Sequence, residues 1–316
     1  MTQTWVFPGV AVITGAGGTG TYTFKSIVGK EKAKITVAQA SVPPQQKGLL
    51  RQDVKESQLR ILNAASLDQT REAILASYPQ TRILLKAGDI SDEGFVESFI
   101  SEVVEAFGRL DYAVNCAGIL GDAMRTTETS TAVFDHINNI NYRGAWFCSR
   151  AELRQMVTQD PLPSHDPNRV PQRGAIVNVA SQLGIVGRPS ARKSAFPHSQ
   201  GLRSTFFWSE LTASDLLLAA YCSSKAAVIA MTRSDAIDYS ADGIRVNCVC
   251  PGVIETPMTT YSEEIREHFR PAVEIAPMKR MGKPEEVADS ILFLCSTFAS
   301  FVQGHALVVD GGYIIN

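Results

Sequence analysis

Short apolar runs, rich in β-branched residues, alternate along the chain with longer stretches of mixed apolar and polar residues. The short runs are almost continuously apolar, which is typical of strands that are buried on both faces of a sheet. We therefore predict that they form the central strands of the fold. These runs are Val10–Thr14, Arg82–Leu85, Leu110–Asn115, Ala175–Ala180, Ile244–Val249 and Ala306–Asp310.

The longer stretches are predicted to be helices. Ser91–Gly108 begins with Ser-Asp-Glu and ends at a glycine, which are common start and stop signals of a helix. Helical patterns also cover Thr131–Val157, Tyr221–Tyr239 and Pro284–Cys295. Because strands that alternate with helices pair in parallel through right-handed crossovers, we expect an α/β fold with a Rossmann-type doubly wound parallel sheet. No shift in composition marks a boundary, so residues 1–316 are predicted to form a single domain.

The composition narrows the class of protein. The chain is 45% hydrophobic and 20% charged, with a formal charge of −2, which is typical of a soluble globular protein. The near-neutral charge provides no basic surface for nucleic acid. No apolar run reaches the eighteen residues of a membrane span, and the N-terminus lacks the features of a signal peptide. We expect a cytoplasmic protein with neither a nucleic-acid nor a membrane partner.

The cysteines and histidines do not suggest a metal site. The six cysteines are scattered and form no CxxC pair, and the five histidines show no spacing typical of metal ligands. Buried, reduced thiols explain this pattern better than disulfides or metal ligands do. We therefore expect no metal.

Polar and glycine-rich motifs follow the predicted strands, at the edge where doubly wound sheets bind their ligands. The first is a glycine-rich turn, Thr14–Gly20, whose main-chain N–H groups could approach a pyrophosphate. By itself such a turn is a weak signal, because many α/β proteins contain one. The later motifs, in chain order, are Gly88-Asp89-Ile90, Asn115-Cys116-Ala117-Gly118, Ser181, the pair Tyr221 and Lys225, and Pro251–Pro257.

In this order the motifs resemble those of the short-chain dehydrogenase/reductase family. The resemblance is strong over residues 66–191 and 220–316 and also includes the C-terminal GHALVVDGG. It implies an NAD(P)-dependent oxidoreductase that interconverts a secondary alcohol and a ketone. Six ordered motifs, each at a strand end, make a chance agreement far less probable than any one of them alone.

The resemblance also assigns catalytic roles. Tyr221 is expected to be the acid/base for the substrate oxygen, supported by the ammonium group of Lys225 one helical turn away. Together with a positive nicotinamide ring, Lys225 is expected to lower the tyrosine pKa. Ser181 would orient the substrate oxygen, and Asn141 would hold a water of the proton relay.

The cofactor is expected to be NAD or NADP. By the same resemblance the phosphates meet the glycine turn, the adenine meets Asp89 and Ile90, and the carboxamide lies near Ile254 and Thr256. The residues expected to bind the cofactor are Gly15, Gly18, Gly20, Asp89, Ile90, Asn115, Ala117, Gly118, Tyr221, Lys225, Pro251, Ile254 and Thr256.

The choice between NAD and NADP depends on the end of the second strand. Two segments could form that strand, Lys34–Gln39 and Leu59–Asn63, and neither ends in an acidic residue. Roughly twenty residues near 40–60 are therefore surplus to the family pattern, and the helix entry after Gly20 has Thr21 where a glycine is expected. These differences leave the cofactor preference open.

A second surplus lies in front of Tyr221. Ser181 and Tyr221 are forty positions apart, against thirteen in the family, which places an insertion near residues 192–218. It could be a substrate-binding loop, an inert surface loop or retained non-coding sequence, and the last explanation would also fit residues 21–65. Because the entropy of loop closure grows slowly with length, the fold can accommodate the insertion in each case.

Two other functions remain open. The altered glycine turn would suit a non-catalytic dinucleotide-binding paralogue, whereas a basic surface near the pocket entrance would suit a 3-oxoacyl-carrier-protein reductase. By resemblance, Asn138–Glu152 and the C-terminal strand end form the contacts of a homotetramer or homodimer, and Glu263–Phe269 is interpreted as a substrate lid. The expected ligand is a small-molecule alcohol or ketone.

Overall fold

The computed structural model describes residues 7, 9–15, 34–40, 68, 71–72, 75–76, 79, 82–121, 124–187 and 218–315. Seven parallel strands form one sheet in the order β3-β2-β1-β4-β5-β6-β7. All six strands predicted from the apolar runs are present. The strands are β1 Val10–Thr14, β2 Lys34–Ala40, β3 Arg82–Gly88, β4 Tyr112–Asn115, β5 Gly174–Val179, β6 Ile244–Pro251 and β7 Ala306–Val309.

The strand order settles which segment forms the second strand. β2 pairs with β1 on one side and with β3 on the other, so Lys34–Gln39 is the correct candidate. The alternative, Leu59–Asn63, and the surplus near 40–60 lie outside the described residues. The order reverses between β1 and β4, which is the switch point where doubly wound sheets bind ligands.

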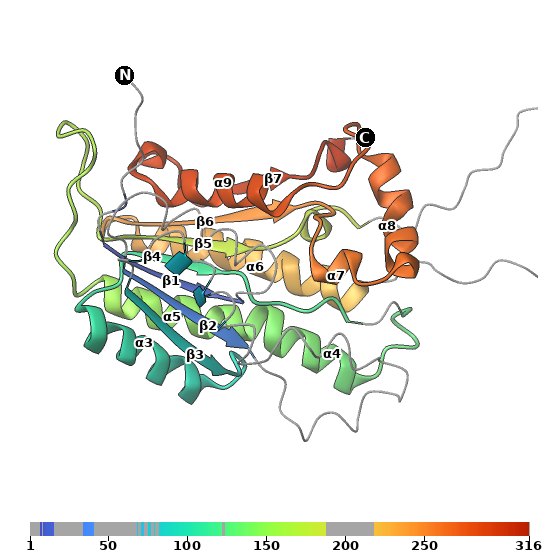
Figure 1. Cartoon of the computed structure of the whole chain (residues 1–316), viewed down its shortest axis with the longest axis horizontal. Coiled ribbons are helices and arrows are strands. Elements are labelled where there is room, and N and C mark those ends of the chain that lie inside the picture. Colours follow the sequence, from blue (N-terminus) through green and yellow to red (C-terminus); the bar gives the residue numbers. More distant parts are fainter. Residues whose placement is uncertain are drawn as a thin grey trace, which may run out of the picture.

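Helices cover both faces of this sheet (Figure 1). Alternate residues of β1 point to opposite faces, so Val10 and Val12 pack in one core and Ala11 and Ile13 pack in the other. The first core lies under α3 (Glu93–Phe107) and α5 (Ala145–Met156), and the second lies under α9 (Pro284–Cys295). The continuous apolar character of the central strands reflects this burial on both sides.

The predicted helix Thr131–Val157 is divided by a turn of π-helix. α4 (Thr131–Asn138) passes into a π-helical segment, Asn139–Gly144, and then into α5. Gly144 ends this segment where a Cβ atom would come within 2.8 Å of Ile90 Cδ1. The wide turn therefore lies directly against the chain that follows β3, and such turns often occur at functional sites.

An arginine at the start of β6 holds the C-terminal end of α9. Arg245 is only 5% exposed and donates hydrogen bonds to the carbonyl oxygens of Leu294, Cys295 and Ser296. These carbonyls have no partner within the helix, and a cation is favourable at the negative end of the helix dipole. Burial lowers the arginine pKa to about 10, which still leaves the guanidinium charged at neutral pH.

Of the remaining helices, α6 (Ala219–Tyr239) packs along the sheet against β6, and α7 (Pro257–Thr260) and α8 (Glu263–Ile275) follow the carboxyl end of β6. Across the part of the chain that the structure describes, no helix is long and apolar enough to span a membrane, and no cluster of side chains is suited to a metal ion. All six cysteines lie in this part, and no disulfide links them.

Candidate active site

The first two turns of α6 carry Tyr221 and Lys225. Their spacing of four residues places both side chains on one face of the helix, with Lys225 Nζ 5.8 Å from the centre of the Tyr221 ring. Lys225 is only 4% exposed, and its Nζ donates to the carbonyl oxygen of Val179 at 2.8 Å. The ammonium group is therefore fixed between α6 and the end of β5.

Ser181 lies beside this pair although forty positions separate it from the tyrosine. It lies two residues beyond the end of β5, is 6% exposed, and its side chain is close enough to Tyr221 to oppose the rise of the tyrosine pKa. The short 3-10 helix after it, Gln182–Gly184, packs on the backbone of α6: a Cβ atom on Gly184 would come within 2.8 Å of the carbonyl carbon of Lys225. This contact between the end of β5 and α6 brings the two hydroxyl groups together.

The pKa values of the pair are set mainly by burial. Burial raises the pKa of Tyr221 to about 12, and the hydrogen bond with Ser181 opposes that rise. Burial also lowers the pKa of Lys225 to about 8, because the charged form loses its hydration. In the protein alone, then, the direction for the tyrosine is opposite to the lowering expected from Lys225, because desolvation outweighs the effect of the ammonium group.

Asn141 lies in the π-helical segment and is locked in place by three hydrogen bonds. Its Oδ1 accepts from the main-chain N–H of Ile119 at 2.8 Å, and its Nδ2 donates to the Ile119 carbonyl and to Ser224 Oγ at 2.9 and 3.1 Å. Ser224 in turn donates to the Tyr221 carbonyl oxygen at 2.7 Å. The asparagine side chain therefore connects the turn after β4 to the helix that carries the tyrosine.

Gly118 provides the space between these groups. A Cβ atom at this position would come within 3.1 Å of Asn141 Oδ1 and 3.2 Å of Lys225 Nζ. Any larger residue would crowd the asparagine and the lysine. A glycine here lets the turn after β4 lie directly against Lys225 Nζ, a donor of the kind that would fit a ribose hydroxyl of a dinucleotide.

The end of β1 lies equally close to the turn after β4. Gly15 has a φ of +72°, and a Cβ atom on it would come within 2.5 Å of the Ala117 main chain. Both the left-handed backbone and the close approach require glycine. The turns that follow the two central strands thus meet at the switch point of the sheet. Gly18 and Gly20 lie outside the described residues.

The other residues predicted to bind the cofactor lie at or just after the ends of β3 and β6. Asp89 follows β3, and its Oδ1 accepts hydrogen bonds from the main chain and hydroxyl of Ser91. Ile90 is 1% exposed and Ile254 is 6% exposed, so both side chains pack in the core. Any cofactor contact at these two positions would therefore come mainly from the main chain. Pro251 ends β6, and Thr256 caps α7.

Asn115 lies in a buried network rather than at an open edge. Its Nδ2 donates to Glu152 Oε2 at 2.9 Å and to Asn178 Oδ1 at 3.0 Å. Asn178 donates onward to Thr232 Oγ1 on α6 at 2.9 Å. This network ties β4 to β5, α5 and α6, and it fixes the start of the turn that contains Ala117 and Gly118.

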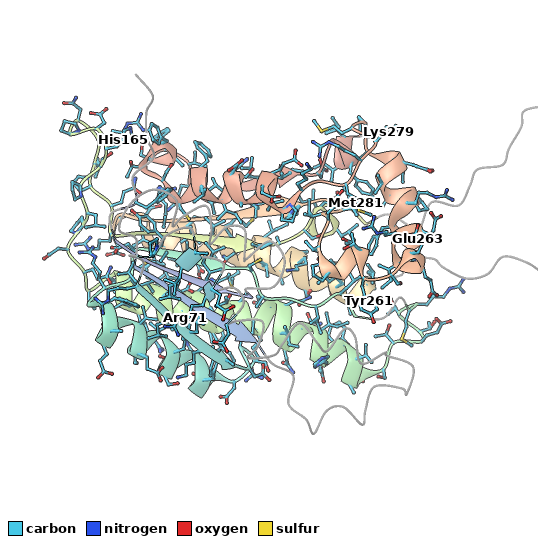
Figure 2. All side chains as sticks on the ribbon, in the orientation of Figure 1. Arg71, His165, Tyr261, Glu263, Lys279 and Met281 are labelled. Atoms are coloured by element: carbon cyan, nitrogen blue, oxygen red, sulfur yellow. The ribbon has the colours of Figure 1, made fainter. Side chains whose placement is uncertain are left out.

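The segment predicted as a substrate lid, Glu263–Phe269, lies within α8, which follows the short helix α7. α8 extends from Glu263 to Ile275, further than the predicted Glu263–Phe269, and Phe269 is buried. Figure 2 shows Tyr261 and Glu263 at the junction of the two helices, at the end of the molecule toward which the strands point. The predicted insertion at 192–218 lies outside the described residues except for Leu218.

Comparisons with known proteins agree with this site. A family profile described as short chain dehydrogenase matches residues 48–193, and one described as enoyl-(acyl carrier protein) reductase matches residues 210–314. The chain belongs to the short-chain dehydrogenase/reductase family. The protein is therefore an enzyme, an oxidoreductase of a family that uses nicotinamide dinucleotide cofactors.

Several relatives of this dehydrogenase/reductase have assigned reactions. The chain is 34% identical to 2-(R)-hydroxypropyl-CoM dehydrogenase of Xanthobacter autotrophicus, over 80% of this chain and 86% of that protein. It is 35% identical to 3-oxoacyl-[acyl-carrier-protein] reductase of Thermotoga maritima, over 72% and 75%. The crystal structure of levodione reductase matches with a TM-score of 0.74 and 27% identity, over 96% of both chains.

Sequence reasoning missed two buried polar residues of this dehydrogenase/reductase. Glu152 is 0% exposed, and Gln182, directly after Ser181, is 4% exposed. The signal for Glu152 was its spacing of four from the buried Cys148 and Met156, which puts all three on one face of α5. For Gln182 the sequence carried no signal, because a glutamine after a strand is usually exposed.

The buried Glu152 should make the stability of the folded protein depend on pH. Burial raises its pKa to about 8, so the folded protein holds a proton that the unfolded chain releases near pH 4.5. Stability must then fall as the pH rises from about 4.5 to 8 and level off above that. Glu152→Gln mimics the protonated acid, so we expect it to be more stable than the parent by roughly 4 kcal/mol at pH 8. Urea unfolding across this pH range measures the difference.

The control for this experiment is Glu105→Gln, which changes an exposed carboxylate on α3. Its free energy of unfolding should follow the parent at every pH. A Glu152→Gln variant whose stability changes with pH as steeply as that of the parent would show that Glu152 is ionised in the folded protein.

Proposed function

We propose that this oxidoreductase interconverts a secondary alcohol and a ketone, with Tyr221 as the acid/base. One observation supports the proposal above the others: Ser181 lies close enough to Tyr221 to affect its pKa, beside a buried Lys225, although forty positions separate the two in the chain. Two neighbouring hydroxyl groups can both be directed at one substrate oxygen, which is the geometry that proton transfer needs.

The chain's own residues would move the proton. In reduction Tyr221 Oη donates a proton to the ketone oxygen, and in oxidation it accepts the proton of the alcohol. Ser181 Oγ donates a hydrogen bond to the same oxygen and fixes its position. When bound, the nicotinamide supplies or accepts the hydride at the carbon atom. Its positive oxidised ring would add to the effect of Lys225 and bring the tyrosine pKa down from about 12.

Lys225 and Asn141 support the tyrosine. The ammonium group lies next to Gly118, where it can also donate to a ribose hydroxyl of the cofactor. Asn141 holds the Ile119 main chain through both of its side-chain polar atoms and so fixes the turn that faces Lys225. We assign it a positioning role, with the relay water held nearby.

The relatives support the class of reaction and leave one alternative substrate open. The 2-(R)-hydroxypropyl-CoM dehydrogenase acts, by its name, on a 2-hydroxy compound, which is a secondary alcohol. The 3-oxoacyl-carrier-protein reductase favours a carrier-bound ketone as the second candidate. Both reactions use the same proton transfer at the carbonyl oxygen, so the two candidate substrates differ only in the groups attached to the carbonyl carbon.

The surface of α4 and α5 supports a homo-oligomer. Phe134, Tyr142 and Trp146 lie along it with exposed fractions of 45%, 38% and 40%. Ile237 on α6 is 78% exposed. Exposed aromatic rows of this kind are typical of protein interfaces. We propose that these helices pair with a second copy of the chain in a homodimer or homotetramer.

Removing the tyrosine hydroxyl tests the mechanism. Tyr221→Phe keeps the ring and its packing, so the fold and cofactor affinity should persist. We expect kcat to fall by at least ~10²-fold, the usual effect of losing acid/base catalysis. Steady-state rates and fluorescence titration of NADH and NADPH measure the two properties. Tyr239→Phe at the other end of α6 is the matched control, and near-normal turnover in Tyr221→Phe would remove Tyr221 from the mechanism.

The end of β2 leads to a prediction about the preference between NADH and NADPH. β2 ends in Gln39 and Ala40, so it provides no carboxylate to repel a 2′-phosphate. We expect the values of kcat/KM for NADH and NADPH to differ by less than ~100-fold, which corresponds to about 2.7 kcal/mol. Initial rates with both cofactors measure this ratio. A stronger preference would mean that a residue outside the end of β2 distinguishes the 2′-hydroxyl of NADH from the 2′-phosphate of NADPH.

Light scattering tests the assembly. At micromolar concentration we expect particles of two or four copies of the 34.3 kDa chain. Trp146→Glu places a charge in the aromatic row and should shift the particles toward monomer, because an unpaired charge is costly to bury. Val170→Glu, at a residue 78% exposed on a loop, is the control. A monomeric parent protein would contradict the proposal.

A further inference from the structure

A pocket of about 320 Å³ lies between α8, the chain before α9 and the ends of β6 and β7. Its volume is near the lower limit for small-molecule sites, so it suits a compact group the size of a single ring. Neither Ser181 nor Tyr221 lines it. Most of the lining is apolar, with Val253, Ile254, Ala272, Val273, Met278 and Tyr313 among its members.

Gln182 brings an amide group to this apolar lining. The residue is 4% exposed, and its Oε1 is buried without a hydrogen-bond partner. That oxygen lies 3.0 Å from the position a Cβ atom would take on Gly252. A buried, unpartnered amide oxygen costs free energy, which a ligand with a hydrogen-bond donor would recover. The last torsion of a glutamine is soft, so the amide can turn toward such a ligand.

The segment after β5 and the end of β6 border both the pocket and the proposed catalytic pair. Ser181 and Gln182 are consecutive, yet their side chains diverge: the serine meets Tyr221 on α6, and the glutamine extends to Gly252 at the end of β6. The loop after β6 also provides Val253 and Ile254 to the pocket. The pocket and the proposed catalytic pair are therefore neighbours, joined through the consecutive residues Ser181 and Gln182.

The charged residues at the pocket already have partners. Arg280 forms a salt bridge with Glu286 at 2.6 Å. Asp310 accepts hydrogen bonds from the main-chain N–H groups of Gly312 and Ile314 at 2.8 and 2.9 Å. These contacts satisfy the charges locally, so the pocket favours a neutral ligand.

We propose that this pocket binds the non-reacting end of the substrate, and that Gln182 selects a compact, neutral, alicyclic or branched group that carries one hydroxyl or similar donor. Gln182 is then a specificity-determining residue. The inference rests on the proposed ketone and alcohol activity and adds the class of substrate to it. It also disfavours a plain acyl chain, which would leave the buried amide oxygen without a donor.

Two cyclic ketones of nearly equal size test the role of the amide. 4-Hydroxycyclohexanone carries the donor, 4-methylcyclohexanone lacks it, and butan-2-one is too small to fill the pocket. We expect the parent enzyme to prefer the hydroxy compound over the methyl compound by at least ~10-fold in kcat/KM. Gln182→Leu should reduce this preference to about 2-fold or less and leave butan-2-one unchanged. Gln155→Leu on α5, outside the pocket, is the matched control.

A second variant tests the pocket itself. Ala272→Leu adds bulk from α8, so the rates with both cyclic ketones should fall by at least ~10-fold while butan-2-one changes by less than about 2-fold. Higher thermal stability with unchanged substrate ratios would show that the pocket is only a packing void, and would overturn the proposal. An equal preference for the two cyclic ketones in the parent would overturn it too.

Binding without turnover separates this inference from the proposed function. Calorimetric titration of cyclohexane-1,4-diol and 4-methylcyclohexanol, with and without reduced cofactor so that no hydride is transferred, measures the pocket directly. Tighter binding of the diol that is lost in Gln182→Leu supports the pocket even if no ketone is reduced, in which case the proposed function alone fails. Equal binding of both alcohols to parent and variant overturns the pocket, whether or not the enzyme reduces butan-2-one.

Discussion

The geometry of the site depends on the contact between the end of β5 and the backbone of α6. Gly184 lies so close to Lys225 that no side chain fits between them. This contact sets the distance between the strand that ends in Ser181 and the helix that carries Tyr221. The chain between the two hydroxyl groups can vary in length, because packing of a strand end on a helix, rather than the connection, determines where they meet.

Much of the fold could be predicted from the sequence, because the sheet is buried on both faces. Burial makes the strands almost continuously apolar, and all six predicted runs are strands. The positions of Ser181 just after a strand and of Tyr221 and Lys225 on one face of a helix could also be predicted, and their catalytic roles stay a prediction. The split of the helix Thr131–Val157 could not, since a π-helical turn changes the hydrogen bonding without changing the apolar pattern.

The buried polar residues were harder to predict. Glu152 and Gln182 are long polar side chains that sequence patterns place at the surface, and only the neighbouring elements show that both are enclosed. The rise of the Tyr221 pKa in the protein without its cofactor could not be predicted either, because spacing along a helix reveals a charged neighbour and does not reveal how much water burial removes.

The π-helical turn lies on the same stretch of helix as the exposed aromatic row. Asn141, which holds the turn after β4, is one residue from Tyr142, which faces solvent. The proposed contact with a second copy and the proposed dinucleotide site at Gly118 therefore involve one structural unit. If either contact shifts this unit, thermodynamic linkage requires that affinity for the dinucleotide and affinity between subunits change together.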